Sequence, residues 1–186
     1  MNRTKRKIFE TAMKLFSEKG YEATSIEEIT ATMGVAKGTL YYHFKSKEEI
    51  FNVLVEDGMK LLENSIEIKT SKCDNTKDKL KAIILIQIKA IIKYESVLSI
   101  IFSQIYGNEN KNKHCQDKVE QYICVIKNVI DEGIEKGDIK PCNSRFLAYT
   151  IFSLTSTIMI YKKQNNKNYS IPELYKECIA SVFDEI

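Results

Sequence analysis

Apolar residues recur along this chain at intervals of three and four positions, the spacing that places them on one face of an α-helix. In the first such segment, Ile8, Ala12 and Leu15 form the apolar face, and Gly20 follows as a stop signal. Glycine is sparse and only two prolines occur in 186 residues, which favours long helices over a sheet with many turns. No segment alternates with a period of two, so the pattern predicts an all-α fold.

Two short helices separated by a glycine come next. Thr24 and Glu27 have the spacing of a capping box, in which the hydroxyl accepts a free backbone N–H and the carboxylate reaches back. This box predicts a helix over 26–33. Gly34 can adopt the positive φ of a tight turn, and a second short helix is predicted over 35–44.

The rest of the chain is predicted to be helical as well. Ser46 and Glu49 form a second capping box, which opens a long amphipathic helix that reaches about Lys69. Further helices are predicted at about 79–94, 97–106, 117–136, 145–163 and 171–183. The segment 145–163 is apolar nearly all round, which is typical of a helix buried on most faces. The total is about nine helices.

The basic residues are unevenly distributed. Residues 1–47 hold nine Lys or Arg against five Asp or Glu, whereas the rest of the chain holds 19 against 20. A basic first quarter on a neutral body is what a nucleic-acid-binding end would look like. Ordinary scatter of surface charge is the alternative explanation.

The five cysteines are odd in number, widely spaced and free of any C-x-x-C motif. With no apolar signal at the N-terminus, they predict unpaired thiols in a reduced, cytoplasmic setting. The most apolar runs, 80–92 and 146–161, fall short of the ~20 residues needed to span a bilayer. We therefore expect no membrane partner.

Metal and catalytic chemistry have little support in the sequence. His114 and Cys115 are the only adjacent pair of possible metal ligands, and no partner ligand follows at zinc spacing. An enzyme that used Cys115 as nucleophile and His114 as base would lack a third group to orient the base. We expect no metal, no cofactor and no catalytic residue.

The stretch KGTLYYHFKSK, residues 37–47, is the second helix of a helix, glycine turn, helix unit. Such units place their second helix in the major groove of DNA. Lys37 and Thr39 stand at its N-terminal end, where side chains reach base edges. Gly38 allows close approach, and Tyr41 offers a ring for a thymine methyl group and a hydroxyl for a hydrogen bond.

Phosphate contacts are expected beside these base contacts. Tyr42 and His43 can donate to phosphate oxygens, and Lys47 lies in the first turn of the next helix, where free N–H groups already favour an anion. Ser25 lies at the start of the preceding short helix, which offers the same kind of phosphate-binding N-terminus. Each residue has an alternative role in packing, and for His43 taken alone a core role is the better interpretation.

The stretch TSIEEITATMGVAKGTLYYHFKSKEEIF, preceded by IFETAMKLFSEKGYEAT, resembles the DNA-binding signature of TetR-family transcriptional regulators. The resemblance covers about the first third of the chain, and its motif is long and ordered. Thr30, Met33 and Ala36 depart from the residues usual in the family. Ala36 removes one hydroxyl that could cap the recognition helix or contact phosphate.

The resemblance implies a DNA-binding domain over 1–47, with its helix-turn-helix at about 25–44. It also implies a ligand-sensing and dimerisation domain over 48–186, whose last two helices pair with those of a second copy. Leu40 and Phe44 would form the core of the small domain. The implied DNA contacts are Ser25, Lys37, Gly38, Thr39, Tyr41, Tyr42, His43 and Lys47.

The sequence of the sensing domain contains no motif that identifies its effector-binding residues. Aromatic residues on its helices could line an apolar effector pocket, or they could be ordinary core. The candidates are Phe102, Tyr106, Tyr122 and Phe152. The identity of the effector is left open.

Two functions remain at this point. The first is a ligand-responsive transcriptional regulator, a repressor by family frequency, whose dimer releases a double-stranded operator when a small molecule binds. The second is a co-regulator or adaptor with the same fold that acts through protein partners. An intact recognition helix favours the first.

Overall fold

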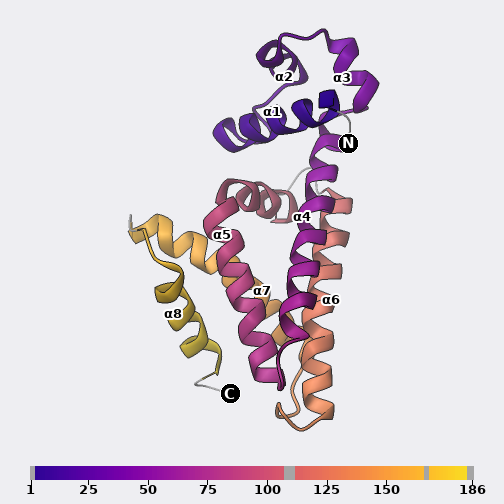
Figure 1. Ribbon diagram of the computed structural model, residues 1–186. Helices are drawn as coiled ribbons and strands as arrows, with labels where there is room; N and C mark the ends of the chain where they lie inside the picture. Colours follow the sequence, from indigo (N-terminus) through magenta and orange to yellow (C-terminus); the bar gives the residue numbers. More distant parts are fainter. Residues whose placement is uncertain (1–2, 107–111, 166–167, 184–186) are drawn as a thin grey trace. The chain divides into compact units, whose positions relative to one another are not determined.

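The computed structural model describes residues 3–106, 112–165 and 168–183, and within them the chain is helical with no strand (Figure 1). The predicted all-α fold is therefore confirmed. The eight helices of these described ranges are α1 (Arg3–Lys19), α2 (Ile26–Met33), α3 (Lys37–His43), α4 (Lys47–Thr70), α5 (Thr76–Tyr106), α6 (Lys113–Glu135), α7 (Ser144–Asn165) and α8 (Ile171–Phe183).

The difference between eight helices and the expected nine lies in α5. The helices predicted over 79–94 and 97–106 form one element that is interrupted at Tyr94, where φ is −129° and ψ is 31°. The chain therefore kinks at Tyr94, at the boundary that the sequence predicted between the two helices.

Most of these helices begin at a Ser or Asn whose side-chain oxygen accepts the backbone N–H three residues later, which satisfies one of the free donors of the first turn. These N-terminal caps are Ser25, Ser46, Asn75, Asn112, Asn143 and Ser170. The box expected at Ser46 is present in part: Ser46 caps α4, while the Glu49 carboxylate accepts from the backbone N–H of Lys45 at 2.6 Å.

The capping box expected at Thr24 is wrong by one residue. Ser25 is the cap of α2, and its Oγ accepts the N–H of Glu28 at 3.1 Å. Thr24 is buried, and its hydroxyl donates to the carbonyl oxygen of Gly20 at 2.8 Å. That bond closes the short loop between α1 and α2, a local role that the spacing of Thr24 to Glu27 does not reveal.

The chain divides into two compact units, each with its own core. The first contains α1–α3, α4 as far as Gly58, and Ser96–Gln116. Its core includes Ile8, Phe16 and Ile29, together with the predicted Leu40 and Phe44. The boundary expected after Lys47 stays a prediction.

Side-chain hydrogen bonds within the first unit tie Ser96–Gln116 to the N-terminal helices. The Asn112 side chain donates to Asn52 Oδ1 at 2.8 Å and to Glu48 Oε1 at 3.3 Å. Gln104 donates to Glu22 Oε1 at 3.4 Å. The Asn112 bonds hold the start of α6 beside α4, and the Gln104 bond holds the end of α5 beside the loop between α1 and α2.

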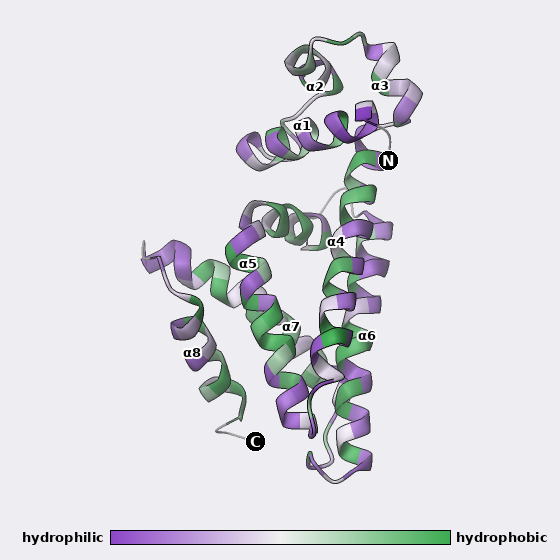
Figure 2. Ribbon diagram, viewed as in Figure 1, coloured by the Kyte–Doolittle hydropathy of each residue, from purple (hydrophilic) through white to green (hydrophobic). Residues whose placement is uncertain are grey.

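The second unit contains Met59–Glu95 together with α6 from Asp117 onward, α7 and α8. Its helices are amphipathic, and green apolar faces alternate with purple polar ones along α4 and α6 in Figure 2. On α7, Ile151 and Phe152 are buried, whereas Phe146 is 73% exposed. Within the described residues, no helix combines the length and apolarity that crossing a bilayer would require.

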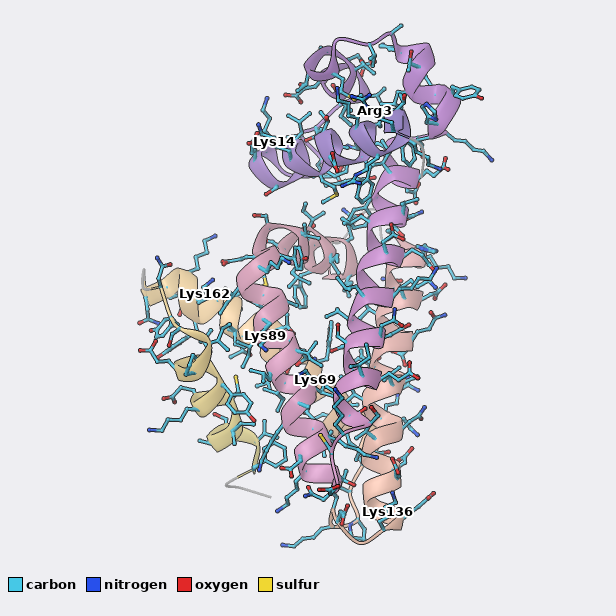
Figure 3. The ribbon with its side chains drawn as sticks, in the orientation of Figure 1. Arg3, Lys14, Lys69, Lys89, Lys136 and Lys162 are labelled. Carbon is cyan, nitrogen blue, oxygen red and sulfur yellow. The ribbon has the colours of Figure 1, made fainter. Side chains whose placement is uncertain are left out.

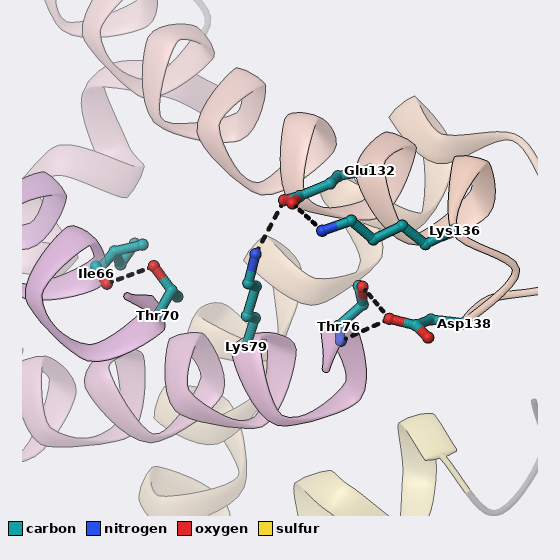
Figure 4. A network of polar contacts seen from close by, with 7 residues as sticks. All are labelled: Ile66, Thr70, Thr76, Lys79, Glu132, Lys136 and Asp138. Atoms are coloured by element: carbon teal, nitrogen blue, oxygen red, sulfur yellow. Dashed lines mark hydrogen bonds and ion pairs between the residues drawn. The ribbon is translucent and has the colours of Figure 1, made fainter. Parts of the chain in front are cut away.

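A polar network holds α5 against the end of α6 in the second unit (Figure 4). The Asp138 carboxylate accepts from the backbone N–H of Thr76 at 3.0 Å and from its hydroxyl at 2.8 Å. These hydrogen bonds lower the pKa of Asp138. Lys79 joins the network through Glu132 at 3.0 Å.

The network depends on a close approach at Gly133. A Cβ atom at this position would lie 2.4 Å from Thr76 Cγ2. We expect Gly133→Ala to lower the free energy of unfolding by roughly 1–3 kcal/mol, because the helices must move apart or Thr76 must leave its rotamer. Urea unfolding followed by circular dichroism measures the change.

Gly58→Ala is the matched control. Gly58 also lies inside a helix, but no atom lies within 4 Å of the place that an alanine methyl group would take there. We expect this variant to gain roughly 0.5–1 kcal/mol, because alanine restricts the unfolded chain and favours the helix. Equal effects of the two substitutions would contradict the close-approach argument.

Candidate nucleic-acid interface

α2, the Gly34 turn and α3 form a helix-turn-helix, and α1 packs against both helices. Gly34 has a φ of 67°, a left-handed conformation that lets it end α2 and turn the chain. α3 has only seven residues and is attached through Leu40, which is completely buried. Phe44, also buried, anchors the end of α3.

The other positions of α3 are turned outward. Tyr41 is 52% exposed and Tyr42 is 84% exposed, and Lys37 and Gly38 are exposed as well. Thr39 and His43 are half-buried. The predicted contact residues of α3 are thus all at least partly exposed.

Gly38 is informative because nothing in the described chain requires glycine there. No atom lies within 4 Å of the position that a Cβ would take, and the backbone is helical without a positive φ. Glycine inside a helix costs about 1 kcal/mol relative to alanine. Gly38 therefore lowers the stability of α3 although no neighbouring atom requires a glycine. A glycine at such a position suits the close approach of another molecule.

Lys37 is held by an ion pair that its sequence position does not reveal. Its Nζ contacts Glu27 Oε1 across the turn. Glu27 raises the pKa of Lys37 and Lys37 lowers the pKa of Glu27, in both cases chiefly through their hydrogen bond. Both groups are exposed, so solvent screens the pair and a stronger anion can replace Glu27.

Lys47 is also engaged within the chain. Its Nζ donates to the carbonyl oxygens of Tyr21 at 2.8 Å and Glu22 at 3.4 Å, and it lies 4.4 Å from the centre of the Tyr21 ring. It therefore fastens the start of α4 to the loop between α1 and α2. Its role as a phosphate contact stays a prediction.

Ser25 has a structural role as the cap of α2 and is exposed. A hydroxyl that accepts from a backbone N–H still has its own proton to donate. That hydroxyl also hydrogen-bonds to the Glu27 carboxylate and helps to lower its pKa, so a phosphate oxygen would have to replace Glu27, and the contact itself stays a prediction.

Two of the four candidate effector residues meet in the second unit. Tyr122 of α6 and Phe152 of α7 pack edge to face with ring centres 6.1 Å apart. Phe102 is half-buried and belongs to the other unit. The side chain of Tyr106 lies outside the described residues.

Gln87 is a polar residue that the candidate set omitted. It is buried on α5, and neither of its amide atoms has a hydrogen-bond partner among the described residues. The hydroxyl of buried Tyr122 likewise lacks one. Burial raises the pKa of Tyr122, and a weak interaction with the Gln87 amide opposes that change, so the two side chains face each other without completing a hydrogen bond. The sequence signal that could have identified Gln87 is its polarity inside the very apolar segment 80–92.

The cysteine that could have supported an enzyme is buried. Burial raises the pKa of Cys115 to about 12, so its thiol stays protonated at neutral pH. His114 Nε2 lies 3.6 Å from Glu56 Oε2. Within the described part of the chain, no three His, Cys, Asp or Glu side chains could together hold a metal ion.

Two protein-family models match the chain. Residues 8–54 match the model described as bacterial regulatory proteins of the tetR family. Residues 73–160 match a tetracyclin repressor-like C-terminal domain. Between them, the two models span the helix-turn-helix, α5, α6 and most of α7.

Individual relatives match over nearly the full length. The HTH-type transcriptional regulator YhgD of Bacillus subtilis is 29% identical over 97% of this chain and 92% of its own. A Clostridium perfringens structure described as a candidate fatty acid metabolism regulator is 29% identical, with a TM-score of 0.86 over 97% of this chain and 98% of that one.

A second solved structure contains bound partners. AibR in complex with isovaleryl coenzyme A and operator DNA is 21% identical, with a TM-score of 0.80 over 97% of this chain and 98% of that one. At this identity the likeness concerns the fold. With both family models matched, the predicted family is confirmed: this chain belongs to the TetR family of bacterial transcriptional regulators.

Proposed function

We propose that this protein is a ligand-responsive repressor whose dimer binds operator DNA and releases it when a small molecule binds the C-terminal domain. The outward face of α3 carries the proposal, above all Gly38, whose lack of a side chain serves no purpose inside the described chain. Residues 1–47 act as the DNA-binding domain and 48–186 as the sensing and dimerisation domain.

The operator contacts follow from the types of side chain on this face. Lys37, Thr39 and Tyr41 read base edges in the major groove. Tyr42 and His43 contact phosphate oxygens. Ser25 and Lys47 add phosphate contacts at the edges of the surface, and these position the protein without reading sequence.

Gln87 and Tyr122 support an effector site in the C-terminal domain. Buried polar groups without partners are rare in folded proteins, and each calls for an explanation. Both side chains are neutral. A neutral carbonyl therefore suits them better than a carboxylate, because burying a charge without a partner of opposite charge is unfavourable. The acyl thioester of the ligand named for AibR has such a carbonyl, so we take acyl thioesters as the first effector class.

Dimerisation is assigned to α7 and α8. In the isolated chain, α7 exposes Phe146, Tyr149, Ile160 and Tyr161. Aromatic and aliphatic residues in this number on one helix are typical of a surface that another subunit covers. A dimer would place two α3 helices roughly 34–36 Å apart, one turn of DNA.

The test is fluorescence anisotropy on DNA from upstream of the protein's own gene, with scrambled duplex as competitor, at two salt concentrations. We expect competitor-resistant binding that weakens with salt. Acyl-CoA should then release the DNA, and by linkage the DNA should weaken acyl-CoA binding by the same factor. Equal binding to operator and scrambled DNA would favour the adaptor function instead.

The ion pair between Glu27 and Lys37 generates a prediction. Glu27→Gln removes a negative charge beside the DNA and frees the Lys37 ammonium, so affinity should rise roughly two- to five-fold. The salt dependence should steepen by about one unit, because one more phosphate charge is neutralised. Glu28→Gln is the control, because Glu28 pairs with Lys19 of α1 instead. An equal gain in both variants would reflect net charge alone.

Tyr122→Phe separates a ligand-binding hydroxyl from a structural one. Removing an unpartnered buried hydroxyl should raise the free energy of unfolding by about 1 kcal/mol. The same variant should need more acyl-CoA to release DNA. Tyr149→Phe is the control, because the Tyr149 hydroxyl donates to Glu120 and its loss should not stabilise the chain. A less stable Tyr122→Phe protein would contradict the assignment.

The double variant Phe146→Glu and Ile160→Glu tests the dimer surface. Four introduced charges at a two-fold interface should separate the subunits, because burying them unpaired is unfavourable. Sedimentation velocity should give a monomer that has lost operator binding. Ile68→Glu on α4, which replaces another exposed apolar residue, should stay dimeric. A dimeric double variant would move the interface elsewhere.

A further inference from the structure

A groove runs between α4 and α5 within the second unit and has a volume of about 350 Å³. Its apolar side is formed chiefly by Leu61, Ile68 and Ile86, and three lysines, Lys69, Lys89 and Lys93, also line it. We call it the α4–α5 groove. Figure 3 shows Lys69 and Lys89 near each other where α4 and α5 run side by side.

The apolar side of this groove is open to solvent. Leu61 is 55% exposed and Ile68 is 59% exposed, and their spacing of seven residues puts them on one face of α4. Exposed aliphatic side chains that gather in a concave surface mark a binding site more often than scattered ones do. Covering these two residues would remove apolar surface from water without disturbing the core.

The charge of the groove is one-sided. Three lysines and no Asp or Glu are among the residues that line it. Within the described part of the chain, none of the three forms an ion pair with a carboxylate, whereas Lys79, Lys127, Lys136 and Lys162 of the same unit all do. Lysines held near one another without a counter-ion attract an anion.

The size of the groove selects among anionic partners. Its volume falls at the lower end of the roughly 300–1,000 Å³ typical of ligand clefts. A partner protein would usually cover about 800 Å² on each side. A concave groove between two helices also suits one extended chain better than the flat face of a bilayer.

We propose that the α4–α5 groove binds a single-chain phosphate amphiphile from solution, with the alkyl or acyl chain along Leu61, Ile68 and Ile86 and the phosphate at Lys69, Lys89 and Lys93. A phosphate monoester carries up to two negative charges and three acceptor oxygens, which three ammonium groups can share. A carboxylate would offset only one of the three positive charges.

This site is separate from the effector site of the proposed function. Gln87 is buried, while its neighbours Ile86 and Lys89 line the groove, so the two sites lie on different faces of α5. The amphiphile site does not depend on the effector assignment, and either one can fail without the other.

Isothermal titration of the full-length protein with monododecyl phosphate, kept below its micellar concentration, tests the proposal. We expect saturable binding that weakens as salt is added, because the contacts are electrostatic and exposed. The double variant Lys69→Gln and Lys89→Gln should bind about ten-fold more weakly. Ile68→Gln should also weaken binding, because it removes part of the apolar side.

Matched controls distinguish this site from general charge and from the effector site. Lys127→Gln with Lys136→Gln removes the same charge from α6 and the turn that follows it, and Tyr122→Phe alters the interior. Both proteins should bind monododecyl phosphate as the native chain does. The substituted groove residues Lys69, Lys89 and Ile68 are exposed, so these variants should keep the native urea midpoint.

Several results would overturn the proposal. Undiminished binding by the Lys69→Gln and Lys89→Gln variant would remove the phosphate site. Equal affinity for dodecanol or dodecyltrimethylammonium would show that charge plays no part. Loss of binding in Tyr122→Phe would place the amphiphile in the interior, and binding only to anionic phospholipid vesicles would make the groove a membrane contact.

Discussion

The burial of Leu40 is the interaction on which the DNA-binding end depends. α3 has seven residues, too few to be stable as an isolated helix in water. It exists because Leu40 is completely enclosed, with buried Phe44 directly after the helix. Attachment along one side leaves the remaining side chains of α3 outward, so the constraint that holds the helix also creates its recognition surface.

The second unit has to be stable and still contain groups that a purely structural core would omit. Gln87 and Tyr122 are buried without hydrogen-bond partners in the described chain, while exposed Leu61 and Ile68 lie in a groove. Each arrangement sacrifices some stability, as functional sites commonly do. Close packing elsewhere offsets it, and Gly133 against Thr76 is an example.

Charge is used differently in different parts of the chain. The lysines of the second unit that contact carboxylates are mostly half-buried, as Lys79, Lys127 and Lys162 are, whereas the pair of Lys136 is exposed and contributes little. In the first unit, Lys47 is committed to backbone carbonyls, whereas Lys37 is held only by an exposed pair with Glu27. Lys37 is therefore the cation that a competing anion can engage more readily.

The sequence by itself determined the helices, the glycine turn and the outward residues of α3, because helical periodicity and turn chemistry act over a few neighbouring positions. Only the tertiary structure decided that Ser25 and not Thr24 caps α2, that Lys47 fastens a loop, and that Gln87 meets Tyr122. The bonds of Ser25 and Thr24 are local, but Lys47 lies 26 positions from Tyr21 and Gln87 lies 35 positions from Tyr122, and these two pairs meet only when helices pack. Spacing along the chain cannot specify that packing, because it depends on the burial of many side chains at once.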